Sequence, residues 1–70
     1  MREQMERLIR EMVDRGIRFE DGLRAFERAF VSEVLTRSNG SLTGAAKTLG
    51  IHRNTLSRKI AEHKIRRRTP

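Results

Sequence analysis

The feature that constrains the fold most is the stretch from Leu42 to Ile60, in which small and apolar residues recur around one glycine. Ser41 precedes the stretch and is a good helix cap, because its hydroxyl can accept a hydrogen bond from an amide of the first helical turn. Gly50 stands where this first helix must end, since glycine adopts the left-handed conformation without steric cost. The pattern predicts two short helices joined by a tight turn.

Apolar side chains occur where two such helices would contact each other. They are Ala45, Ala46 and Leu49 in the first helix, Ile51 in the turn, and Leu56 and Ile60 one turn apart in the second. The alanines carry little bulk and therefore let the helices cross closely. Three residues separate Ala46 from Gly50, and five separate Gly50 from Leu56, which is the spacing of a helix-turn-helix.

The outer face of the second helix is polar. At about 100° per residue, the side chains that lie away from its apolar side are those of Arg53, Asn54, Ser57 and Arg58. All four can form hydrogen bonds with base edges or phosphates. This face is therefore predicted to contact nucleic acid.

Seventy residues form one small domain, and such a domain often needs an oligomer, a metal or disulfides for stability. The sequence has no cysteine, which excludes disulfides and thiolate metal sites. No apolar run approaches the roughly 20 residues of a membrane span, and no signal-peptide pattern is present. We expect a cytoplasmic protein that avoids membranes and is stabilised by oligomerisation.

The net charge of +7 is unevenly distributed. Seven arginines against eight acidic residues give residues 1–36 a charge of −1, whereas nine Lys or Arg against one Glu give residues 37–70 a charge of +8. A near-neutral half followed by a strongly basic half suggests an assembly region joined to a region that binds a polyanion. The alternative is a basic surface that is merely solvated.

Two longer helices are expected before this motif. Residues 2–15 carry an apolar stripe at helical spacing, which consists of Met5, Leu8, Ile9, Met12 and Val13 and can pack within one chain or against a second one. Gly16 is predicted to end this helix. A helix over residues 21–38, with Asp21 as its cap, carries a line of apolar contacts made by Leu23, Phe26, Phe30 and Val34.

The aromatic residues are predicted to pack in the core, although three phenylalanines could also be interpreted as a base-stacking platform. Ile17 and Phe19 are expected to fold back over the core from the linker. Ile65 is expected to turn back onto the core after the last helix. Arg66 begins a basic tail over residues 66–70, which has no reason to be ordered.

Catalysis is not expected. His52 and His63 lie eleven residues apart and have no acid or cysteine at ligand spacing, so no metal or other cofactor is expected. His52 is predicted in the turn near a phosphate, and His63 on the surface at the end of the last helix. Glu62 is the only acid of the basic half and is expected to pair with a neighbouring base.

Residues 23–65 resemble the Fis-type DNA-binding domain, which occurs in nucleoid proteins and at the C-terminus of NtrC-class σ54-dependent activators. The stretches that carry the resemblance are FERAFVSEVLTRSNG, LTGAAKTLGI and RNTLSRKI. The resemblance implies an all-α fold of four helices, whose first two form an intertwined dimeric four-helix core with a second copy. Residues 1–38 would be the dimerisation helices, and residues 39–65 the helix-turn-helix.

The resemblance also implies which residues have which role. The dimer interface would comprise Met5, Leu8, Ile9, Met12, Leu23, Phe26, Phe30 and Val34. The DNA-binding residues, with those of the polar helix face, would be Ser41, Thr43, His52, Arg53, Asn54, Thr55, Ser57, Arg58 and Lys59. Arg53 would read bases with His52 adjoining it, and Thr55 and Arg58 would bind phosphates. His52 departs from the family's nucleoid members, which have asparagine at this position.

The first hypothesis is therefore a bacterial homodimer that binds double-stranded DNA with sequence preference and bends it, in transcription regulation or nucleoid organisation. Its further partners would be RNA polymerase or the remainder of a σ54 activator. The second hypothesis is a protein-interaction module whose basic end contacts an acidic protein or an anionic lipid. RNA binding is a weaker third, because neither exposed aromatics nor a sheet platform is apparent.

Overall fold

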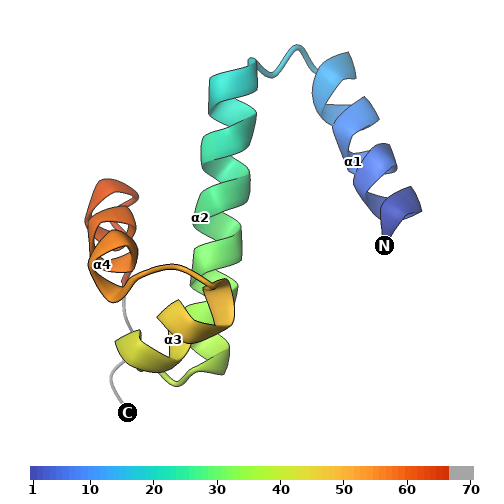
Figure 1. Cartoon of the computed structure of the whole chain (residues 1–70). Coiled ribbons are helices and arrows are strands. Elements are labelled where there is room, and N and C mark those ends of the chain that lie inside the picture. The colour runs from blue at the N-terminus through green and yellow to red at the C-terminus, as the bar shows by residue number, and fades with distance from the viewer. Residues whose placement is uncertain (67–70) are drawn as a thin grey trace.

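The computed structural model describes residues 1–66, and this part of the chain is entirely helical, with no strand. Its four helices are α1 (Arg2–Asp14), α2 (Phe19–Arg37), α3 (Leu42–Leu49) and α4 (Arg53–Glu62). In Figure 1, α3 and α4 gather beside the C-terminal half of α2, while α1 stands apart and joins α2 only through a short loop. The predicted all-α fold of four helices is confirmed. None of the described helices is long and apolar enough to cross a membrane.

All four helices end in the same way. A residue one or two positions beyond each helix adopts a left-handed conformation, and the amide of the following residue donates to a carbonyl five residues earlier. These hydrogen bonds join Ile17 to Met12, Gly40 to Leu35, Ile51 to Ala46 and Ile65 to Ile60. Gly16 and Gly50 provide the left-handed residue at φ values of 72° and 71°, as predicted. Three of the four donors are isoleucines, and this position commonly carries an apolar side chain that packs back on the helix.

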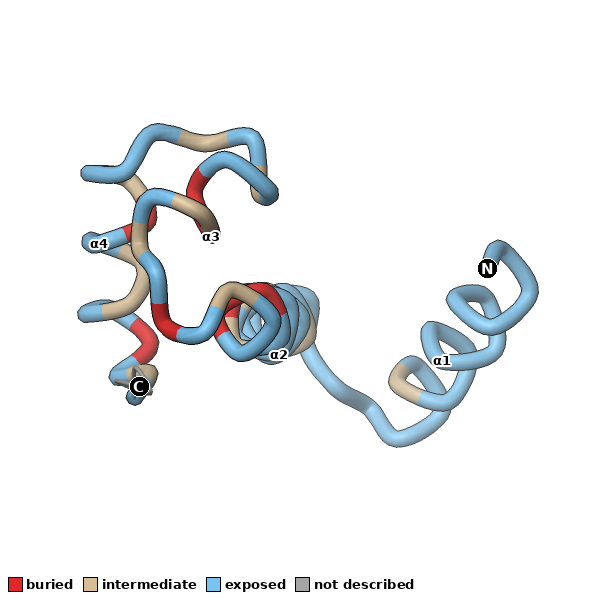
Figure 2. The backbone as a smooth tube through the Cα atoms, turned by 90° about the horizontal axis from the view of Figure 1, so that it is seen from below, coloured by how far each residue is buried: buried red, intermediate tan, exposed pale blue. Residues whose placement is uncertain are grey.

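The core lies between α2, α3 and α4. Its buried apolar residues are Val31, Val34 and Leu35 of α2, Ala45 and Ala46 of α3, and Leu56 of α4. Figure 2 shows these buried positions on the three helices, whereas α1 is almost wholly exposed. Leu56 has no exposed surface, and Ile60 and Ile65 pack against the same cluster. The contacts predicted for the apolar face of the helix-turn-helix are confirmed.

The segment between α1 and α2 differs from the prediction. Phe19 is 81% exposed and already belongs to α2, and Ile17 is also exposed, so neither covers the core. The reason is that the loop directs α1 away from the core instead of across it (Figure 1). The predicted cap at Asp21 is also wrong, because α2 begins two residues earlier, after Arg18. Asp21 lies in the first turn, where its charge still favours the positive end of the helix.

The helices α1 and α2 approach each other closely at one position. A Cβ atom at Gly22 would lie 2.9 Å from the terminal methyl carbon of Met12 and 3.6 Å from a methyl of Ile17. Met12 is the one partly buried residue of α1, and the rest of that helix is exposed. The N-terminal helix is therefore tethered at its end and leaves its apolar stripe uncovered.

Candidate nucleic-acid interface

Both helices of the helix-turn-helix have a side-chain cap. Ser41 accepts a hydrogen bond from the Gly44 amide at 3.2 Å, which confirms the predicted cap of α3. At the start of α4, the Nδ1 atom of His52 accepts a hydrogen bond from the Asn54 amide at 3.0 Å. The second cap was not found from the sequence, because histidine is not among the residues that commonly cap helices.

The cap at His52 assigns the tautomer of its neutral ring. Because Nδ1 accepts the Asn54 amide proton, the ring proton must be on Nε2. The His52 side chain is exposed, so its Nε2–H group is a donor available at the very start of α4. His52 therefore combines a structural bond to the helix with a free hydrogen-bond donor.

We expect His52→Ala to lower the free energy of unfolding by about 1 kcal/mol, because the Asn54 amide loses its acceptor. His52→Asn should keep the stability of the wild type, since asparagine is a good cap. Urea unfolding followed by circular dichroism measures both effects. Equal stability of the wild type and the alanine variant would show that the cap contributes nothing.

The remaining polar residues predicted at this interface lie on the outer surface. The exposed ones are Ser41 and Thr43 of the α3 N-terminus, and Arg53, Asn54, Ser57 and Arg58 of α4, whereas Thr55 is partly buried. Within residues 1–66, neither Arg53 nor Arg58 has an acidic partner. Among the described residues, the first half of α4 and the start of α3 thus present two guanidinium groups without an acidic partner, and several hydrogen-bonding side chains, to solvent.

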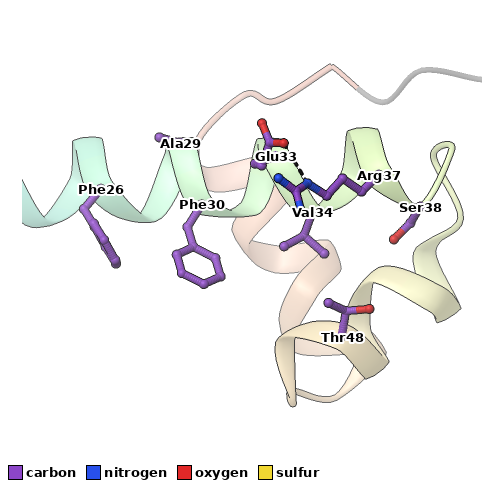
Figure 3. A pocket seen from close by; sticks show the side chains of 8 residues that line it. All are labelled: Phe26, Ala29, Phe30, Glu33, Val34, Arg37, Ser38 and Thr48. Atoms are coloured by element: carbon purple, nitrogen blue, oxygen red, sulfur yellow. Dashed lines mark hydrogen bonds and ion pairs between the residues drawn. The ribbon is translucent and has the colours of Figure 1, made fainter. Parts of the chain in front are cut away.

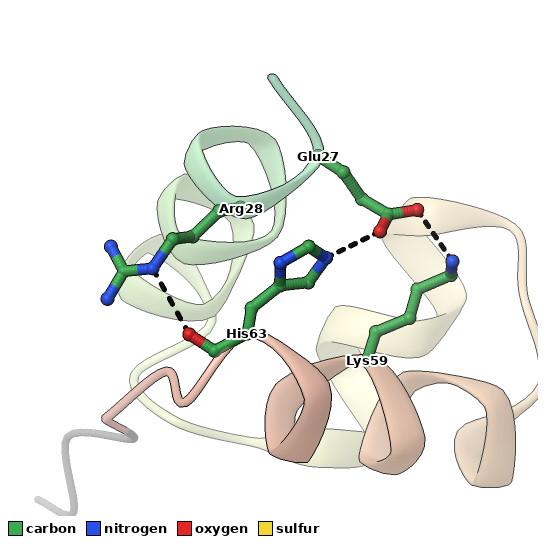
Figure 4. Close-up of polar contacts among 4 residues, drawn as sticks. All are labelled: Glu27, Arg28, Lys59 and His63. Carbon is green, nitrogen blue, oxygen red and sulfur yellow. Dashed lines mark hydrogen bonds and ion pairs between the residues drawn. The ribbon is translucent and has the colours of Figure 1, made fainter. Parts of the chain in front are cut away.

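Lys59 has a different environment from the other predicted contacts. Its Nζ atom lies 2.6 Å from Oε1 of Glu27, and both side chains are about one-third exposed. The other carboxylate oxygen of Glu27 lies 2.5 Å from Nε2 of His63 (Figure 4). One carboxylate of α2 therefore binds two side chains that lie one turn apart at the end of α4.

The surface position predicted for His63 is wrong. His63 is only 8% exposed, because the side of α4 that carries Leu56 and Ile60 continues to His63 and turns it toward α2. Its backbone carbonyl also accepts a hydrogen bond from Nε of Arg28 at 3.2 Å. The arginine thereby places a positive charge beside the carbonyls that end α4, which is the favourable sign at a helix C-terminus.

The pKa of Glu27 is lowered from its ordinary value of 4.5. The largest cause is the hydrogen bond from Lys59, followed by that from His63, and partial burial acts in the opposite direction. Because the folded state lowers this pKa, Glu27 stabilises the fold above its ordinary pKa. That contribution is lost as the pH falls through the lowered value.

We therefore expect Glu27→Gln to remove part of the acid sensitivity of the fold. The free energy of unfolding of the wild type should fall relative to that of the variant as the pH drops below about 4.5. Urea unfolding at a series of pH values measures this difference. A constant difference between the two proteins from neutral to acidic pH would contradict the role of the Glu27 carboxylate.

Glu27, Glu62 and His63 are the one set of three acidic or histidine side chains in the described chain whose possible metal-ligand atoms all lie within 4.8 Å of one another. The Lys59 ammonium, however, already lies on the Glu27 carboxylate and neutralises it. We therefore describe the group as a hydrogen-bonded ion pair, Glu27 with Lys59, extended by His63.

A second surface feature is an open groove of about 570 Å³ along α2 (Figure 3). Its lining residues are Phe26, Ala29, Phe30, Glu33, Val34, Arg37 and Ser38 of α2 and its end, and Thr48 of α3. The rings of Phe26 and Phe30 lie 5.6 Å apart, both pointing to the same side of α2, and both are about half exposed. The prediction that these rings are buried in the core is therefore wrong for a single chain.

The residues predicted at a dimer interface fall into two groups. Six are exposed, namely Met5, Leu8, Ile9, Leu23, Phe26 and Phe30, and Met12 is partly buried against α2. Val34, in contrast, is 8% exposed and packs in the core of its own chain. The exposed members lie on α1 and α2, and we call them together the apolar face.

Comparison with known proteins adds sequence evidence to this geometry. A family model described as "Bacterial regulatory protein, Fis family" matches residues 22–63, more than half of the chain. A protein of Ralstonia nicotianae with the provisional name Fis-like DNA-binding protein is 35% identical over 72 residues, covering 89% of this chain and 94% of that protein. No solved structure matches the chain.

Proposed function

This chain is a member of the Fis family of bacterial regulatory proteins, and we propose that it binds double-stranded DNA as a homodimer. The single observation that carries the proposal is that Arg53 and Arg58, which have no acidic partner in the described chain, lie on the exposed face of a helix-turn-helix. In such a motif the second helix enters the major groove with its N-terminal residues toward the bases. This helix is α4.

The proposed roles follow from position along α4. Arg53 lies in the first turn beside His52 and is placed to read a base edge, since arginine binds guanine through two hydrogen bonds. Arg58 lies more than one turn further along and is placed to bind a phosphate. Ser41 and Thr43, at the exposed start of α3, are in position to contact the DNA backbone.

Dimerisation is supported by the imbalance between the small core and the large apolar face. Only six apolar residues are buried in the described chain, while the apolar face leaves Phe26, Phe30 and several side chains of α1 exposed. Large apolar side chains exposed in this number mark an interaction site. A second copy is the proposed partner, and two-fold symmetry then predicts a roughly palindromic DNA site.

We expect Arg53→Ala and Arg58→Ala to have different effects on DNA binding. The first should cost about 1–3 kcal/mol at the preferred site and reduce discrimination between bases. The second should weaken binding to all sequences alike and flatten the dependence of affinity on salt, because a phosphate contact is lost. Gel-shift titrations at several salt concentrations measure both effects. Loss of base preference in the Arg58 variant alone would reverse the two assignments.

The biological role proposed for this binding is transcription regulation or nucleoid organisation. A dimer that presents two α4 helices is expected to bend its site, so part of its selectivity would come from DNA deformability. RNA polymerase, or the remainder of a σ54 activator, is the proposed protein partner. Circular-permutation gel shifts test the bending. If the DNA is bent, the mobility of the complex should vary with the position of the site along the DNA fragment.

A further inference from the structure

Among the residues proposed to contact DNA, Lys59 is the one whose charge is already engaged inside the chain. Arg53 and Arg58 are unpaired, whereas the Lys59 ammonium lies 2.6 Å from a carboxylate oxygen of Glu27. We infer that Lys59 is a positioning residue, which Glu27 uses together with His63 to fix the orientation of α4 on α2. This inference rests on the proposed function, because the orientation of α4 matters only where α4 meets its ligand.

Two adjacent residues of α2 hold the end of α4 through three contacts (Figure 4). Glu27 binds Lys59 through one oxygen and His63 through the other, and Arg28 donates to the His63 carbonyl at 3.2 Å. Two contact points one turn apart on α4 restrict both the tilt and the rotation of that helix. By contrast, Leu56 packs in the apolar core, which has no directional bonds of its own.

If Lys59 moved to a DNA phosphate, the Glu27 carboxylate would lose its strongest partner while it is partly buried and close to a polyanion. The lowered pKa of Glu27 agrees with a carboxylate that is stabilised by its present partners. With Lys59 in place the pair is neutral, so the attraction of α4 for phosphates comes from its unpaired arginines.

Phe26 of the apolar face directly precedes Glu27 in α2, and Phe30 follows one turn later. The ion pair therefore joins α4 to the same segment of α2 that is proposed to contact the second copy. In a dimer, the angle between α2 and α4 determines the distance between the two α4 helices. Glu27, Lys59 and His63 thus set the spacing of the half-sites.

The test compares Lys59→Met with Arg58→Met, two neighbouring cations replaced by the same apolar side chain. Affinity is measured against salt for one duplex, and then for duplexes whose half-sites differ in spacing. Arg58→Met should reduce the slope of log affinity against log salt by about 1 and keep the preferred spacing. Lys59→Met should leave the slope unchanged and reduce the preference for one spacing at least about threefold. Lys59→Arg, which keeps the ion pair, should retain that preference.

A second measurement does not depend on DNA. The unfolding constants of Glu27→Gln, Lys59→Met and the double variant form a thermodynamic cycle. We expect the unfolding constant of the double variant to differ at least about twofold from the value that two independent effects would give, because each single variant already removes the shared contact. Additive effects would overturn the positioning role even if the chain bound no DNA. A salt slope reduced by about 1 in Lys59→Met, with unchanged spacing preference, would show instead that Lys59 contacts phosphate.

Discussion

Replacement of Leu56 by alanine should strongly destabilise the helix-turn-helix, so that it unfolds at a much lower urea concentration than the wild type. Leu56 is the largest fully buried side chain in the described structure. It extends from α4 into the core that α4 forms with α3 and the C-terminal half of α2. Truncation of such a leucine costs about 2–5 kcal/mol, because apolar contacts are lost and a cavity remains. Small domains are stable by only about 5–15 kcal/mol, and this core contains few other large side chains.

Circular dichroism during urea titration measures this effect. The alanine variant should lose most of its helical signal at low urea, where the wild type remains folded. Leu56→Met is the matched control, because it keeps the volume nearly constant and should cost less than about 1.5 kcal/mol. An alanine variant with the urea midpoint of the wild type would show that the core is not organised around Leu56.

The second large effect is expected for Phe30→Glu, which should dissociate the proposed dimer. Phe30 is 51% exposed in one chain, and burial of a phenylalanine against a partner contributes about 1.5–3 kcal/mol. A glutamate would instead place an unpaired charge in an apolar contact, and two-fold symmetry repeats the change in the second chain. We expect the dimer dissociation constant to rise by at least about a hundredfold, which corresponds to ~2.7 kcal/mol.

Analytical ultracentrifugation measures the dissociation constant, and circular dichroism verifies that the variant remains helical. Ala25→Glu is the matched control, because Ala25 is also exposed on α2 but lies about 140° around the helix from Phe30. The control should remain dimeric. If Phe30→Glu and Ala25→Glu have the same dissociation constant as the wild type, the apolar face is not the dimer interface.

Much of the helix-turn-helix could be predicted from the sequence because its determinants are local. The Ser41 cap, the left-handed Gly50 and the spacing from Ala46 to Leu56 each act within a few residues, and the structure confirms all of them. The long helices were also predicted, although the start of α2 was placed two residues too late. A cap without a side-chain bond, at Arg18, leaves no signal in the sequence.

The contacts that could not be predicted join distant parts of the chain. Glu27 meets Lys59 and His63 across more than thirty residues, and neither charge pattern nor helical periodicity specifies that pairing. Periodicity predicted that the side of the last helix with Leu56 and Ile60 would be covered, but it could not show which residues of α2 would lie opposite Lys59 and His63. The orientation of Ile17 and Phe19 was missed for a similar reason, because it depends on the direction in which the loop carries α1.

Two chains, joined through α1 and α2, are proposed to present two α4 helices to one DNA duplex. Sedimentation equilibrium of the chain, alone and with a duplex selected from a random pool, tests this claim directly. We predict twice the mass of one chain for the free protein and two chains per duplex at saturation. A free chain that stays monomeric at high concentration, and that saturates the duplex one chain at a time or does not bind it, would contradict the account.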